Sequence, residues 1–220
     1  MPDEGELDKY KILAHRRTCI PFRQSLAEKL NINPYHVGEE IFSIEGVKDF
    51  LKRYPYSYFK SPWSSSGRGV VSSTHISEKG LFEWTSGSIR RQGSVLAERG
   101  DERILDFATE WKCENRKAIF LGLSVFKTSP RGKYQGNVSA LQEELNRIIS
   151  SASPYWNADI IAAQQEVVEE LISRDYTGPL GIDMLIDKEK KINLCVEINL
   201  RLTMGHIEIM RDDKRADKIV

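Results

Sequence analysis

Two acidic side chains near the C-terminal end of the chain have a spacing that favours metal binding. Residues 178–199 alternate apolar and polar positions like two strands, and a turn at Glu189–Lys191 would place Asp183 directly opposite Glu197. Like charges in opposite positions destabilise a strand pair, so the two carboxylates require a cation. Asn199 shares the face of Glu197. Two carboxylates and an amide oxygen are hard ligands that suit Mg²⁺ or Mn²⁺.

The same register predicts which other residues of this hairpin face each other. An ordinary solvent-facing strand pair with incidental acids is the alternative to a metal site. The metal site is favoured by Arg201 to Gly205, which would add a cation and a glycine turn where phosphate oxygens would lie. The remaining predicted pairs are Lys188–Ile192, Ile182–Ile198, Met184–Val196, Ile186–Leu194, Leu185–Cys195 and Asp187–Asn193.

A second candidate site is a loop of small residues that follows a lysine. Residues 56–60 alternate aromatic and polar side chains and predict a short strand ending at Lys60. A loop of small residues can turn several backbone N–H groups towards an anion, and Lys60 would add a positive charge. The loop lacks the GxxxxGK[ST] pattern of a P-loop, and a flexible linker is the alternative. Its candidate nucleotide-binding residues are Ser64, Ser65, Ser66, Gly67, Arg68 and Gly69.

The order of these motifs resembles that of the ATP-grasp superfamily. A lysine strand, a Ser/Gly loop, the VLAE segment at 95–98 and a GIDMLID…VEIN hairpin follow one another, and EINLRLTMG is similar to the EINPR strand end of that family. The resemblance covers about residues 55–205. It implies an α+β fold whose two subdomains, with mainly antiparallel sheets, enclose Mg-ATP. It also implies a ligase that activates a carboxylate as an acyl phosphate for attack by an amine or similar nucleophile.

The resemblance implies a role for each motif residue. Lys60 would contact the ATP phosphates and, with Arg201, support catalysis. The Ser/Gly loop would close over the phosphates, and Glu98 with Arg99 would begin the hinge that meets adenine and ribose. The implied metal ligands are Asp183, Glu197 and Asn199.

The chain departs from the family pattern at several positions. Leu200 stands where the family usually has proline. The second phosphate lysine has no clear counterpart, with Lys48, Lys52 and Arg53 as candidates, and the ribose-binding acid is open among Asp101, Glu102 and Asp106. For an acidic substrate, the polar segment 127–137 offers Lys127, Arg131, Lys133 and Tyr134, although an exposed basic loop is the alternative.

The element pattern and the resemblance divide the chain into four parts. Residues 1–54 would be a helical tail of the domain that precedes ATP-grasp in the family, 55–98 the small subdomain, 99–210 the large subdomain, and 211–220 a charged tail. We expect helices at 78–92 and from Asn157 to about 174, and strands at 94–98, 103–112, 117–127, 179–187 and 192–199. By comparison with the family pattern, we expect most of the family's N-terminal domain to be lacking. The alternatives are therefore a nucleotide-binding fragment without turnover, or an ATP-grasp phosphotransferase.

Composition restricts the partners of the chain. Lys+Arg and Asp+Glu both number 32, so the net charge does not predict binding to nucleic acid or to an anionic membrane. An apolar run of membrane-spanning length, about 18 residues, does not occur in the sequence, nor does a signal-peptide pattern. With three cysteines and no even pairing, we expect a cytoplasmic enzyme. Its partners would be ATP and small carboxylate and amine substrates, and a homo-oligomer is left open.

Overall fold

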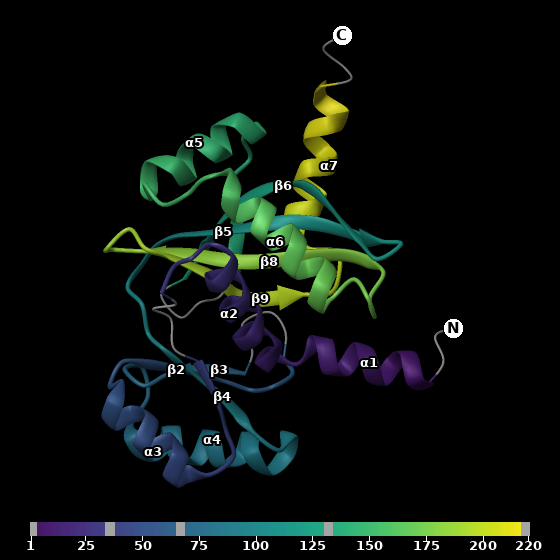
Figure 1. Cartoon of the computed structure of the whole chain (residues 1–220). Coiled ribbons are helices and arrows are strands. Elements are labelled where there is room, and N and C mark those ends of the chain that lie inside the picture. The colour runs from purple at the N-terminus through teal and green to yellow at the C-terminus, as the bar shows by residue number, and fades with distance from the viewer. Residues whose placement is uncertain (1–3, 34–37, 65–68, 130–133, 217–220) are drawn as a thin grey trace.

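Two antiparallel sheets form the frame of the protein. The computed structural model describes residues 4–33, 38–64, 69–129 and 134–216. The smaller sheet has the order β1 (Gly38–Ile41), β4 (Val95–Arg99), β2 (Ser57–Lys60) and β3 (Val70–Ser72). The larger sheet has the order β7 (Tyr134–Asn137), β6 (Lys117–Thr128), β5 (Arg103–Glu114), β8 (Gly178–Asp187) and β9 (Ile192–Asn199). Figure 1 shows one sheet below the other.

Helices cover the two sheets on their outer sides and also enter the space between them. In Figure 1, α3 (Ile44–Arg53) and α4 (Glu78–Gln92) lie beneath the smaller sheet. α5 (Gln142–Ala152) lies above the larger sheet, and α6 (Ala158–Leu171) crosses in front of it. α7 (Met204–Ala216) packs on β6 near its start, and α2 (Cys19–Lys29) packs against β9 and α6. α1 (Glu4–Ala14) leads into a single 3-10 turn, η1 (Arg16–Thr18), which contacts β9.

Each sheet has its own apolar core. Phe50 of α3, Phe59 of β2 and Val95 of β4 are fully buried together beneath the smaller sheet. Trp111 of β5 and Ile182 of β8 are fully buried in the larger core with residues of α2, α5 and α6. The alternation that the sequence shows along these strands therefore places one face of each strand in a core.

Local chemistry explains where the predicted helices begin and end. The side chain of Ser77 accepts a hydrogen bond from the backbone N–H of Gly80 at the start of α4, and the helix ends at Gly93 with φ 84°. The side chain of Asn157 accepts from the backbone N–H of Asp159 at the start of α6. α4 matches its predicted range, and α6 ends at Leu171. None of the described helices is both long and apolar enough to cross a membrane.

Several elements differ from the sequence expectation. Residues 38–41 lie in the segment expected to be helical, yet they form strand β1, which pairs with β4 in the smaller sheet. Gly205 lies in the first turn of α7 instead of in a glycine turn, and this helix extends into the expected charged tail. β7 and α5 were not predicted. The division of the chain into four parts stays a prediction.

The β8–β9 hairpin confirms two predicted pairs, Asp183–Glu197 and Ile182–Ile198, and then shifts register. Beyond Asp183, Leu185 pairs with Asn193 and Ile186 with Ile192, so residues 194–196 of β9 lie opposite Met184 alone. The turn lies one residue earlier than expected: the Asp187 N–H donates to the Lys191 carbonyl at 3.0 Å, and Lys190 has φ 64°. The predicted pairs Lys188–Ile192, Ile186–Leu194, Leu185–Cys195 and Asp187–Asn193 are therefore wrong, and Met184 and Val196 lie in the irregular stretch, outside the regular ladder.

The register shift has a consequence for the site. A bulge leaves backbone groups out of the strand ladder. Here the Cys195 carbonyl accepts a hydrogen bond from Arg23 Nη1 at 3.0 Å, and the Val196 carbonyl accepts from Lys60 Nζ at 3.2 Å. The irregular part of β9 thus contacts cationic side chains from α2 and from the smaller sheet.

Candidate nucleotide and metal site

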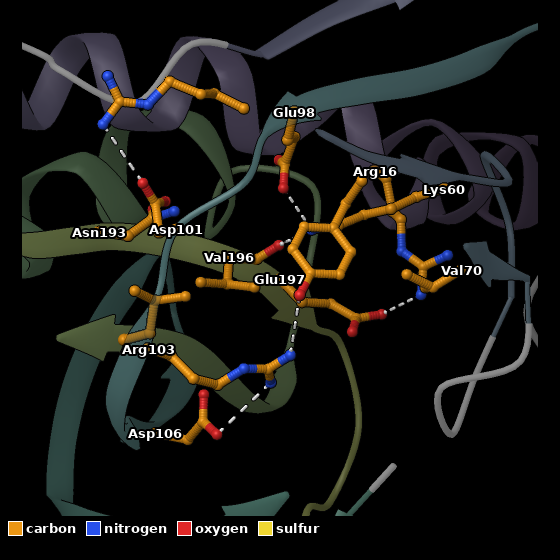
Figure 2. Close-up of a pocket in the computed structure, with 13 residues that line it drawn as sticks. Arg16, Lys60, Val70, Glu98, Asp101, Arg103, Asp106, Asn193, Val196 and Glu197 are labelled. Atoms are coloured by element: carbon orange, nitrogen blue, oxygen red, sulfur yellow. Dashed lines mark hydrogen bonds and ion pairs between the residues drawn. The ribbon is translucent and has the colours of Figure 1, made fainter. Parts of the chain in front are cut away.

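A cavity of about 140 Å³ lies between the two sheets (Figure 2). The smaller sheet and η1 supply one wall, and β5, β8 and β9 with the segment that leads into β5 supply the other. Its polar and charged lining residues are Arg16, Tyr58, Lys60, Glu98, Arg99, Asp101, Arg103, Asp106, Asn193 and Glu197.

Glu98 is the centre of a charge network on the wall of this first cavity. Lys60 Nζ lies 2.5 Å from Glu98 Oε2, and Arg23 Nη1 lies 3.0 Å from Glu98 Oε1. Burial opposes the charged form of Glu98, but the charges and hydrogen bonds of Lys60 and Arg23 outweigh it and lower its pKa to about 2. Lys60 is therefore held at the cavity in one position, between Glu98 and the Val196 carbonyl.

Arg16 is a second cation at the first cavity, and the sequence analysis missed it. This buried side chain donates from Nη2 to Glu197 Oε1 at 2.8 Å, and from Nη1 to the Ser61 carbonyl at 2.9 Å and to Ser64 Oγ at 2.5 Å. Figure 2 shows it reaching Glu197. It joins the start of the Ser/Gly loop to a predicted metal ligand. No spacing pattern identifies Arg16, because its partners lie 45 to 181 positions away in sequence.

A second cavity, of about 320 Å³, adjoins the first because Glu197 lines both. Burial raises the pKa of Asp183 well above its usual range, and the nearby charges of Glu197 and Glu110 raise it further against the opposing effects of Asn199 and Arg201. The remaining residues around this second cavity are Ser124, Phe126, Thr128, Tyr134, Asn137, Thr203, Met204 and Gly205.

The donor groups around Asp183 can be compared with those that a divalent cation requires. The charged form of Asp183 is disfavoured beside the carboxylates of Glu197 and Glu110, and a cation bound next to Asp183 would stabilise it. Asp183 and Glu197 are directly opposite in the ladder, and Asn199 follows on the same face, where its Oδ1 accepts from Arg201 at 2.7 Å. Within the described part of the chain, no three or more His, Cys, Asp and Glu side chains are arranged so that they alone could hold a metal ion. Mg²⁺ ordinarily takes one or two carboxylates and completes its shell with water and phosphate, so the donor set fits it.

The structure brings most of the predicted site residues to these cavities. Lys60, Glu98 and Arg99 line the first, Asp183, Asn199 and Arg201 the second, and Glu197 both. At the Ser/Gly loop, Ser64 contacts Arg16, and the Gly69 carbonyl accepts from the Ser61 N–H at 2.8 Å. Ser65, Ser66, Gly67 and Arg68 lie outside the described residues.

The candidates that the sequence left open, for the second phosphate-binding cation, the ribose-binding acid and the acidic-substrate site, lie in different parts of the structure. Lys48, Lys52 and Arg53 lie on α3, with Phe82, Asp49 and Glu39 as their respective partners. Asp101 and Asp106 line the first cavity, whereas Glu102 pairs with Lys188 at 2.6 Å. Tyr134 lines the second cavity, and Arg131 and Lys133 lie outside the described residues.

Comparisons with known proteins connect this geometry to a fold. Neither the family models nor the curated proteins match the sequence. Among solved structures, the biotin carboxylase domain of Hydrogenobacter thermophilus 2-oxoglutarate carboxylase, in complex with MgADP, ADP and bicarbonate, has a TM-score of 0.62 at 13% identity. N5-carboxyaminoimidazole synthetase from Staphylococcus aureus, in complex with ADP, has 0.59 at 14%. D-alanyl-alanine synthetase A from Vibrio cholerae has 0.59 at 12%.

These similarities extend over nearly the whole chain but only part of each neighbour. They cover 89%, 88% and 90% of this chain, and 41%, 46% and 59% of the three neighbours in the same order. The chain has the ATP-grasp fold, with two α+β layers built on mainly antiparallel sheets, and the fold prediction is confirmed.

Proposed function

We propose that this chain forms the nucleotide- and metal-binding part of an ATP- and Mg²⁺-dependent ligase. Its substrates would be a carboxylate, activated as an acyl phosphate, and an amine or similar nucleophile. The observation that carries the proposal is the meeting of two cavities at Glu197, between the two sheets of an ATP-grasp fold. Buried cations line the first cavity, and paired carboxylates line the second.

In this proposal ATP occupies the first cavity with its phosphates towards Glu197. Lys60 and Arg16 already contact carboxylate and carbonyl oxygens there, and phosphate oxygens would replace part of these contacts. The loop from Ser64 to Gly69 begins beside Arg16 and would supply backbone N–H groups to the phosphates. The hinge role of Glu98 and Arg99 towards adenine and ribose stays a prediction.

Asp183, Glu197 and Asn199 are the residues that would hold Mg²⁺ or Mn²⁺. When bound, the metal would neutralise charge on the phosphate oxygens that otherwise repels an incoming carboxylate. Arg201, at the same cavity, would bind the oxygens of the transferring phosphoryl group or of the acyl phosphate. These residues act by binding, orientation and charge, so the proposed reaction requires no side-chain nucleophile.

The proposed reaction balances in two displacements. A carboxylate oxygen attacks the γ-phosphorus and ADP leaves, which gives the acyl phosphate. The nucleophile then attacks the acyl carbon, inorganic phosphate leaves with the electrons of the broken C–O bond, and the proton lost by the nucleophile passes to the departing phosphate or to water. Walls supplied by both sheets would limit access of water to the acyl phosphate.

The experiment that tests the activity is positional isotope exchange in ATP that carries ¹⁸O at the β–γ bridge. Reversible formation of an acyl phosphate scrambles this label, so the proposal expects scrambling that depends on both Mg²⁺ and an added carboxylate and is lost in Arg201→Ala. Phosphate release that also requires an amine would separate a ligase from a phosphotransferase.

A nucleotide-binding part without turnover is the second candidate. It is favoured by one observation: the chain spans only 41–59% of the three neighbours. Tight nucleotide binding with no scrambling for any carboxylate would support this candidate over the ligase.

A further inference from the structure

Arg16 is a cation that contacts one of the predicted metal ligands directly. Its Nη2 lies 2.8 Å from Glu197 Oε1, whereas Arg201, the cation of the second cavity, donates to the amide oxygen of Asn199 at 2.7 Å. The side chains of Arg16 and Glu197 are 5% and 28% exposed, so the pair is largely removed from water. This ion pair has to break before the same oxygen of Glu197 can bind another cation.

The other contacts of Arg16 lie on the smaller layer. Its backbone N–H donates to the Pro62 carbonyl at 3.1 Å, and its Nη1 donates to the Ser61 carbonyl at 2.9 Å and to Ser64 Oγ at 2.5 Å. These three partners lie between the end of β2 and the start of the Ser/Gly loop. Release from Glu197 would therefore leave the guanidinium beside the loop that would surround the phosphates.

The guanidinium of Arg16 also has a donor without an acceptor. Its Nε is buried and has no hydrogen-bond partner among the described residues. A buried donor without a partner destabilises the arrangement to which it belongs. A phosphate group presents several oxygens and can accept from two guanidinium nitrogens at once. Phosphate would thus supply the acceptor that the present contacts of Arg16 do not.

The contacts of Arg16 with Glu197 and with phosphate exclude each other at Nη2. Movement of Nη2 to a phosphate oxygen would break the contact with Glu197 and leave this carboxylate available to a cation. In return, a divalent cation at Glu197 would repel a guanidinium that remained there. Binding of phosphate and binding of the cation would therefore promote each other through Arg16, and such coupling is reciprocal.

We propose that Arg16 is an internal competitor of the divalent cation. It binds Glu197 until the phosphates of a nucleotide draw it away, so that the metal enters the site together with the nucleotide. The inference rests on the proposed function, because it assumes a metal at Glu197 and phosphates in the first cavity. It adds an order of binding, and it assigns that order to a residue of the N-terminal segment.

Mn²⁺ without nucleotide tests the competition, with electron paramagnetic resonance as the measure of unbound ion. Arg16→Gln removes the charge opposite Glu197, so we expect the affinity for Mn²⁺ alone to rise at least about threefold, as for release from a partly exposed ion pair. Arg17→Gln is the matched control, because Arg17 is 50% exposed and pairs with Glu40 at 3.6 Å. It should bind Mn²⁺ like the wild type. No gain in Arg16→Gln would overturn the proposal.

ADP in the presence of a chelator tests the other partner of Arg16. By calorimetry, Arg16→Gln should bind ADP at least about tenfold more weakly than the wild type, because a charge-assisted hydrogen bond to phosphate is lost. Adenosine, which has no phosphate, should bind both proteins alike. Opposite changes for Mn²⁺ and ADP distinguish competition from a structural defect, which would weaken both. Unchanged ADP affinity in Arg16→Gln would overturn the proposal.

Arg16→Lys provides the same test if Arg16→Gln does not fold. Lysine keeps the charge, but its single nitrogen cannot reproduce the contacts that the two terminal nitrogens of arginine make. We expect the same two changes at a smaller size, and unchanged affinities for both Mn²⁺ and ADP would overturn the proposal.

Nuclear magnetic resonance of the ¹⁵N-labelled wild type follows Arg16 itself. The Nε–Hε signal of Arg16, identified by its loss in a position-16 variant, should shift when ADP is added with a chelator and stay in place with adenosine. A signal that ADP does not shift would contradict the movement of Arg16 to phosphate.

Binding of Mg-ADP to the wild type separates the two proposals. Mg-ADP binding together with unchanged Mn²⁺ affinity in Arg16→Gln would contradict the competition and leave the nucleotide site intact. Failure of the wild type to bind Mg-ADP would contradict the proposed function itself.

Discussion

At the scale of single residues, charge is controlled by partners that lie far away in sequence. Glu98 is 13% exposed at its side chain and contacts Lys60 of β2 and Arg23 of α2. Its pKa of about 2 against an ordinary 4.5 means that the folded state binds its proton less readily than the unfolded chain. This contribution to stability is fully present above about pH 4.5 and is lost as the pH falls towards 2.

Glu98→Gln tests this contribution. The shift corresponds to on the order of 3 kcal/mol of stability at neutral pH, because each pKa unit is about 1.4 kcal/mol. We expect the variant to be less stable than the wild type in urea unfolding at pH 7, with the difference shrinking by pH 3. Glu102→Gln serves as the exposed control. Parallel loss of stability at both pH values would contradict the assignment.

Glu197 is the residue that joins the two cavities, and its charge should matter to the metal. Glu197→Gln removes the negative charge of a predicted metal ligand, which is also the charged partner of Arg16. We therefore expect the affinity for Mg-ADP to fall at least about tenfold while the fold is retained. Titration calorimetry with and without Mg²⁺, together with a thermal melt, measures both. Glu189→Gln, an exposed acid at the hairpin turn, is the matched control. Unchanged Mg-ADP affinity in a folded Glu197→Gln protein would remove Glu197 from the metal site.

At the scale of elements, local chemistry determines where some helices start. Asn157 caps α6 through its side chain, so Asn157→Ala should cost about 1 kcal/mol of unfolding free energy. Asn157→Asp keeps an accepting oxygen and should be close to the wild type. Chemical denaturation of the two variants measures the difference, and equal stability of Asn157→Ala and the wild type would show that the cap contributes nothing.

The elements that the sequence could predict are those with such local signals. α4 and α6 have side-chain caps and apolar stripes, and β5, β6, β8 and β9 are long strands of 8 to 12 residues. α5 begins at Leu141 without a side-chain cap bond, and β1 and β7 are four-residue strands, so local pattern does not distinguish them. The register shift in β9 is accompanied by contacts of its carbonyls with Lys60 and Arg23, which lie far away in sequence.

The same distinction, between local sequence signals and contacts made only through the fold, applies to the candidate site. Asp183, Glu197 and Lys60 could be predicted because their spacing within or beside strands carries information about facing positions. Arg16 and Glu110 could not, because each reaches its partners through the fold and belongs to no short motif.

At the scale of the whole molecule, the cleft is a property of two sheets brought together. β2 and β4 supply Lys60 and Glu98, while β8 and β9 supply Asp183 and Glu197. Lys60 therefore lies in the layer of the smaller sheet, whereas the Asp183–Glu197 pair lies in the layer of the larger one. A ligand that contacts both layers should therefore stabilise the folded chain as a whole.

The most direct test of the central claim is calorimetric titration of ATP into the 220-residue chain, first with Mg²⁺ and then with the metal removed by a chelator. The account predicts saturable binding with Mg²⁺ that weakens at least about tenfold without it, since the paired carboxylates repel uncomplexed phosphates. Absence of binding under both conditions, or equal affinity with and without Mg²⁺, would contradict a Mg-nucleotide site between these two sheets.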